Sequence, residues 1–228
     1  MRKNRMMRLA SALLILTMVT TCAISGTFAK YVTTDSATDT ARVAKWGVEI
    51  TANGTTFATQ YTNKAGDNGV QVKSDTTDKV VAPGTWGELV ECTLAGTPEV
   101  AVSVTYDATL TLAGWTTDGT TEYCPVYFTV NGETYGIQDD CSVTLDNSSA
   151  DVAALITAVE EAIEDYSAEY GVNQNLSDEA TVATPDVSWH WEFVSVDDTK
   201  DTALGDAAAD GTPAVISLTV ATTVTQLD

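Results

Sequence analysis

The chemistry open to this chain is limited by its single histidine, His190. It lies in the run Ser188-Trp189-His190-Trp191-Glu192-Phe193. Alternate side chains of a strand point to opposite faces, so Trp189, Trp191 and Phe193 would point inward. His190 would then point outward with Ser188 and Glu192, which predicts a surface histidine. A Ser-His-Asp triad stays open, because its members need not be neighbours in sequence.

Motifs for other catalytic chemistry are missing from the sequence. It contains no His-Glu-x-x-His pair for zinc, no Gly-x-Ser-x-Gly elbow and no glycine-rich phosphate loop. We therefore predict a protein that is not an enzyme and that needs no cofactor.

Two groups of aspartates could supply oxygen ligands for calcium. One is Asp139-Asp140, and the other comprises Asp197, Asp198 and Asp201, with Asp206 nearby. Neither has the spacing of a twelve-residue calcium loop, so capping of turns and solvation are favoured over metal binding. The five tryptophans could form a glycan platform, but Trp46, Trp86, Trp189 and Trp191 fall within expected strands, which favours core packing. Trp115 alone follows an evident turn.

The first 29 residues are typical of an export signal. Arg2, Lys3, Arg5 and Arg8 precede an uncharged apolar run that ends near Val19, too short to span a membrane. The small residues at Thr27 and Ala29 predict cleavage between Ala29 and Lys30. A lipid anchor on Cys22 is the less favoured alternative, because Val19-Thr20-Thr21 lacks the small residues of lipidation signals.

Cleavage would leave a strongly acidic chain with three cysteines. The formal charge of −21 would become −25, since the signal holds four basic residues and no acidic one. Such a surface repels nucleic acid and anionic lipid. Cys92, Cys124 and Cys141 cannot all pair within one chain, so a Cys124–Cys141 disulfide and three free cysteines both remain open.

The mature chain has the composition of antiparallel strands separated by Gly, Asn and Asp turns. Strict alternation predicts long strands over 100–112 and 216–224. Shorter strands are expected over 44–50, with Trp46, Val48 and Ile50 inward, and over 85–94, 126–130 and 187–196. Apolar spacings of three and four predict one amphipathic helix over about 149–170, whose acidic face we expect to be solvated. The fold expected is an all-β antiparallel sandwich of jelly-roll type over 43–228.

Three segments resemble the TasA and camelysin family of secreted proteins from Gram-positive bacteria. They are the junction Ser25-Gly26-Thr27-Phe28-Ala29-Lys30-Tyr31, the strand entrance Val81-Ala82-Pro83-Gly84-Thr85-Trp86-Gly87, and the closing section from Trp189-His190-Trp191-Glu192-Phe193 to Gly205-Asp206. The resemblance implies export with a SipW-type signal peptidase and a jelly roll that polymerises into biofilm matrix fibres. It also implies that the released N-terminal segment completes the sheet of the next subunit.

We therefore expect a secreted structural subunit that forms a homopolymer and keeps no membrane anchor after cleavage. Its extension over 30–42 would act as the donor strand, beginning with Tyr31, Val32 and Thr33, although a disordered terminus is the simpler alternative. Two other functions remain open. One is a camelysin-type secreted metallopeptidase, for which the chain shows no zinc motif, and the other is a monomeric surface module that binds glycan or calcium.

Overall fold

The computed structural model describes residues 45–53, 57–58, 60–61, 71–194 and 196–228. Four predictions therefore lie outside the described residues: the signal peptide, the cleavage site at Ala29 and Lys30, the extension over 30–42, and the donor residues Tyr31, Val32 and Thr33.

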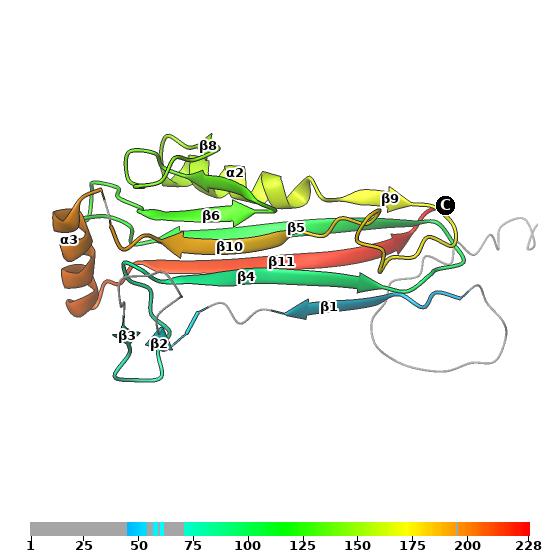
Figure 1. Cartoon of the computed structure of the whole chain (residues 1–228), viewed down its shortest axis with the longest axis horizontal. Helices are drawn as coiled ribbons and strands as arrows, with labels where there is room; N and C mark the ends of the chain where they lie inside the picture. The colour runs from blue at the N-terminus through cyan, green and yellow to red at the C-terminus, as the bar shows by residue number, and fades with distance from the viewer. Residues whose placement is uncertain (1–44, 54–56, 59, 62–70, 195) are drawn as a thin grey trace, which may run out of the picture. The chain divides into compact units, whose positions relative to one another are not determined.

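The described part of the chain is mostly β-strand, arranged in three sheets (Figure 1). The largest sheet has the order β1 (Glu49–Asn53), β4 (Trp86–Ala95), β10 (Asp186–Trp191), β6 (Val126–Val130), β7 (Glu133–Gly136) and β8 (Asn147–Ser148). The second has the order β11 (Val215–Gln226), β5 (Val102–Ala113) and β9 (Ala168–Tyr170), and β2 (Gln60–Tyr61) pairs with β3 (Val72–Lys73). All pairings are antiparallel except that of β7 with β8. The mostly-β fold expected from the sequence is confirmed.

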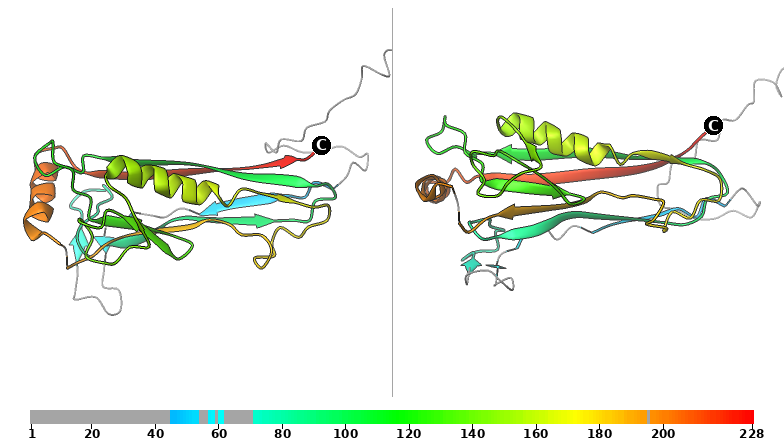
Figure 2. Two further views of the ribbon diagram at one scale, coloured as in Figure 1. Left: turned by 90° about the horizontal axis from the view of Figure 1, so that it is seen from above. Right: turned by 45° about the horizontal axis from the view of Figure 1, so that its top comes forward.

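Alternation along the strands explains how the two larger sheets pack. On β5 every second residue from Val102 to Leu112 is buried, and these residues join the inward side chains of β4, β6 and β10 in one core. Figure 2 shows β5 and β11 in one layer, and β4 and β10 in the other. The largest fully buried side chains in this core are Trp115, Trp189, Tyr123 and Phe128.

Most predicted strands are present, with differences at their ends. The segments over 85–94, 100–112, 126–130 and 216–224 correspond to β4, β5, β6 and β11. The first strand begins later than predicted, at Glu49. Trp46 and Val48 do pack against the core, but Ile50 is exposed.

The predicted strand over 187–196 is wrong in its last part, because β10 ends at Trp191. Trp189 and Trp191 are buried as predicted, whereas Phe193 is 51% exposed. The reason is that β10 ends at Trp191, whose N–H donates to the carbonyl oxygen of Thr85. Beyond this bond the chain leaves the sheet toward a helix.

Of two other tryptophans, one differs from its prediction. Trp86, expected in the core, is 36% exposed and lies opposite the outward-facing His190 on the neighbouring strand. Trp115, expected in a turn, is buried, and its indole N–H donates to the carbonyl oxygen of Val215 at 3.1 Å.

The predicted helix is present as α2 (Val152–Glu164), shorter than the segment over 149–170. Its N-cap is Asp151, whose carboxylate accepts from the N–H of Ala154 at 2.8 Å. Val152, Leu155, Val159 and Ile163 are buried, in the spacing that indicated a helix. The helix packs mainly against β5.

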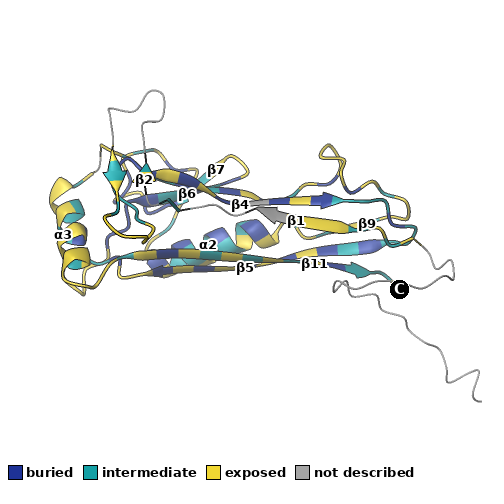
Figure 3. Cartoon of the chain, turned by 90° about the horizontal axis from the view of Figure 1, so that it is seen from below, coloured by how far each residue is buried: buried dark blue, intermediate teal, exposed yellow. Residues whose placement is uncertain are grey.

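A second helix, α3 (Asp198–Ala209), was not predicted. Its N-cap is Asp197, which accepts hydrogen bonds from the N–H groups of Thr199 and Lys200. Leu204 is its one buried residue, and Figure 3 shows most of the helix exposed. The helix lacks the apolar periodicity by which the sequence could have revealed it.

Candidate functional site

The outer edge of β11 is the longest open strand edge in the described part of the chain. β11 pairs with β5 over twelve residues without a shift in register, and no other described strand pairs with it. It contains no charged residue and no proline. Charge, proline and bulges are common protections of edge strands, and β11 has none of these three. The edge strands of the larger sheet, β1 and β8, have five and two residues.

The direction of the β11 backbone groups follows from hydrogen bonds on the far side of β5. The N–H of Leu110 donates to Glu160 on α2, away from β11. Leu110 lies opposite Leu218 in the register, so this is a pair without hydrogen bonds between the two strands. The N–H and C=O of Leu218 therefore point to the open edge. Because the pattern repeats every two residues, the same is true of Val220 and Thr222.

The inward-facing side chains beside this edge are only partly buried. Leu218 and Val220 face inward, opposite the buried Leu110 and Ala108, but they are only half-buried. Thr222 is also half-buried, and its Oγ1 lies 3.3 Å from the Sγ of Cys92 on β4. One more strand along β11 would pair the open amides and cover these side chains.

The opposite edge of the same sheet is protected. There, β9 pairs with β5 over Val102–Val104. Beyond β9, the N–H groups of Tyr106 and Leu110 donate to Ser167 Oγ at 3.0 Å and to Glu160 Oε1 at 2.7 Å. The N–H of Ala108 makes a longer bond, of 3.5 Å, to Glu164. The acidic face of α2, predicted to be solvated, thus provides hydrogen-bond acceptors to a strand edge.

An apolar cavity of about 430 Å³ lies where β11 begins. It is bounded by Val215 and Ile216, by Val81–Pro83 ahead of β4, by Trp191, and by Leu204 on α3.

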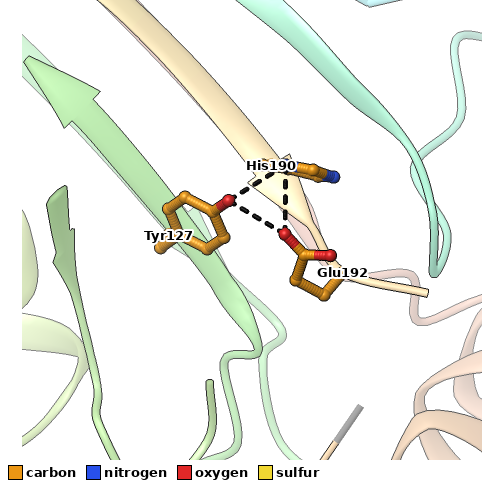
Figure 4. Close-up of polar contacts among 3 residues, drawn as sticks. All are labelled: Tyr127, His190 and Glu192. Atoms are coloured by element: carbon orange, nitrogen blue, oxygen red, sulfur yellow. Dashed lines mark hydrogen bonds and ion pairs between the residues drawn. The ribbon is translucent and has the colours of Figure 1, made fainter. Parts of the chain in front are cut away.

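His190 belongs to a polar cluster on the outer face of the larger sheet (Figure 4). The hydroxyl of Tyr127 lies 3.0 Å from both His190 Nδ1 and Glu192 Oε1, and His190 Nδ1 lies 3.4 Å from Glu192 Oε1. Burial, followed by the neighbouring Glu192, raises the pKa of Tyr127. The prediction that His190 faces outward is confirmed. Its ring packs beside the Tyr127 ring at 5.4 Å, an ordinary distance for a cross-strand pair.

Three of the aspartates considered as calcium ligands accept hydrogen bonds within the protein. Asp140 is buried and accepts from the N–H of Cys124 at 2.9 Å, and burial raises its pKa. Asp201 accepts from the Tyr123 hydroxyl at 2.9 Å. Asp197 caps α3, Asp198 lies in the first turn of that helix, and Asp139 is exposed. Among the described residues, no three His, Cys, Asp or Glu side chains are placed to hold a metal ion.

Cys92, Cys124 and Cys141 are free and buried. Cys124 and Cys141 therefore do not form the disulfide that the sequence left open. Burial raises the pKa of the Cys141 thiol to about 12.

None of the helices that the structure describes has the length and apolar character needed to cross a membrane.

The chain was compared with protein families, with curated proteins and with solved structures. No family model, curated protein or solved structure matches the chain.

Proposed function

We propose that this chain is a secreted structural subunit of an extracellular matrix fibre and that its sandwich is of jelly-roll type. In this proposal a SipW-type signal peptidase releases the N-terminal segment, and residues Lys30 to Thr40 of one copy pair with β11 of the next. The observation that carries the proposal is the open edge of β11, beside which the inward-facing side chains are only partly buried.

The edge has the properties of an acceptor for an added strand. Main-chain hydrogen bonds give such an interaction its affinity, and alternate side chains of the guest enter the space between the sheets. The open amides of Leu218, Val220 and Thr222 can form the main-chain hydrogen bonds. The half-buried side chains of the same residues mark the space that the guest's side chains would enter.

The length of the N-terminal segment matches this edge. Residues 30–44 number fifteen and would extend over about 50 Å, whereas the twelve residues of β11 extend over about 40 Å. The segment is rich in threonine and contains Tyr31 and Val32, which are residues common in strands.

A proline at the centre of β11 tests the proposal. Because the N–H of Val220 points away from β5, Val220→Pro should keep the pairing with β5 but prevent pairing with a guest strand. Val220→Ala is the matched control for the lost side chain. We expect the alanine variant to form filaments in electron micrographs, and the proline variant to remain monomeric with a similar melting temperature. Filament formation by a folded proline variant would refute the proposal.

A further inference from the structure

The described domain has two distinct ends along its strands. At the first, which we call the entry end, the N–H of Glu99 donates to the carbonyl of Lys45, where the described chain begins, and the N–H of Leu227 donates to Ala101. The chain therefore enters and leaves beside the loop over 96–101. At the second, the α3 end, lie α3 and the start of β11. β4 and β11 both run from the α3 end to the entry end (Figure 1).

The short reach of the N-terminal segment restricts where a donor domain can lie. If about twelve of its fifteen residues pair with β11, about three remain, or roughly 10 Å of chain. The entry end of the donor must then lie next to one end of the acceptor. If the donated strand is antiparallel to β11, the donor's entry end lies at the acceptor's α3 end. If the strand is parallel to β11, the donor's entry end lies at the acceptor's entry end.

Exposed apolar side chains distinguish the two ends. The α3 end carries Phe193, Val194, Val196 and Val215, which are 51%, 68%, 51% and 45% exposed. The apolar cavity opens beside Val215. At the entry end, Val172 is 58% exposed next to Asn173, whose N–H donates to the carbonyl oxygen of Pro98. Ile50, opposite Leu94 near the end of β4, is 38% exposed there. The α3 end thus has the larger apolar surface to cover, and it is continuous with the edge of β11.

From these observations we infer that the donated strand runs antiparallel to β11 and that the α3 end of each copy docks against the entry end of a second copy. The inference rests on the proposed function. It adds the direction of the donated strand and a second contact, between the α3 end of one copy and the entry end of the next. The contact joins two different surfaces, so copies repeat head to tail, and they form a polar filament when the rotation between copies does not close a ring. Parallel donation would bring two entry ends together and would favour a closed dimer.

Covalent cross-linking determines the direction of the strand. Thr223 and Ser217 are both exposed on β11 and lie six residues apart, or about 20 Å. Two double variants of the mature chain, Thr33→Cys/Thr223→Cys and Thr33→Cys/Ser217→Cys, are assembled and treated with a short bis-maleimide. The native cysteines are buried. Each single variant serves as the control for cross-links through them.

The outcomes separate the inference from the proposed function. Antiparallel donation predicts a ladder of covalent oligomers from the Thr33/Thr223 pair and none from the Thr33/Ser217 pair. The reverse result would overturn the inference and leave strand donation standing. No cross-link from either pair, in chains that still form filaments, would refute strand donation onto β11 and the inference with it.

A second measurement tests the docking of the α3 end directly. Phe193→Ser/Val194→Ser should raise the critical concentration for filament formation about tenfold, because centrally buried apolar residues dominate such contacts. Thr109→Ser, at an exposed position in the middle of β5 and away from both ends, is the control and should change this concentration little. Equal critical concentrations for the two variants would contradict docking at the α3 end.

Discussion

Trp191 and Phe193 differ in burial because β10 ends between them. Trp191 is buried, with its ring 5.5 Å from that of Trp115, while Phe193 lies beyond the last residue of β10. Trp191→Ala should therefore destabilise the fold by about 3–5 kcal/mol. Phe193→Ala should change the free energy of unfolding by less than about 0.5 kcal/mol. Urea denaturation measures both, and equal losses would contradict the assignment.

Because Asp140 is buried, its ionisation should lower the stability of the folded state as the pH rises. Because burial raises its pKa in the folded state, its contribution to stability is fully present below the unfolded pKa of about 3.9. That contribution is lost as the pH rises through the folded pKa. Asp140→Asn is neutral throughout and keeps an acceptor for the N–H of Cys124.

The asparagine variant should thus be more stable than the parent at about pH 7 and should lose this advantage below about pH 4. Thermal denaturation across this range measures the difference. A difference that does not change with pH would show that ionisation of Asp140 has no effect on stability.

At the scale of elements, α2 protects one edge of the smaller sheet with its side chains. Glu160→Ala removes the acceptor for the N–H of Leu110 and should cost about 1–3 kcal/mol. Glu161→Ala, at an exposed position on the same helix, is the control and should cost less than about 0.5 kcal/mol. Both values come from chemical denaturation. Equal effects would mean that the acidic face is only solvated.

Periodicity explains which elements could be predicted. β5 and β11 alternate strictly and α2 has apolar residues at every third or fourth position, so their patterns alone indicated them. α3 buries only Leu204, and its acidic residues indicated a turn as well as a helix. The role of Glu160 was missed because an acidic helix face has the same sequence pattern whether it meets water or a strand edge.

For the whole molecule, the candidate site could be predicted only in part. The sequence indicated β11 as a strand, but whether a strand lies at an edge depends on its partners, and β11 pairs with β5, about 100 residues earlier. The acidic surface is a whole-molecule property that could be read directly. The formal charge of −21 repels a second copy of the chain, so any contact between copies, such as an added strand, must offset this repulsion.

Removal of the N-terminal segment tests whether this segment joins one copy of the chain to the next. A chain trimmed to begin at Arg42 is compared with the mature chain by electron microscopy and light scattering, with circular dichroism as the control for folding. We expect filaments from the chain that begins at Lys30 and folded monomers from the trimmed one. Filaments from the trimmed chain would contradict this expectation.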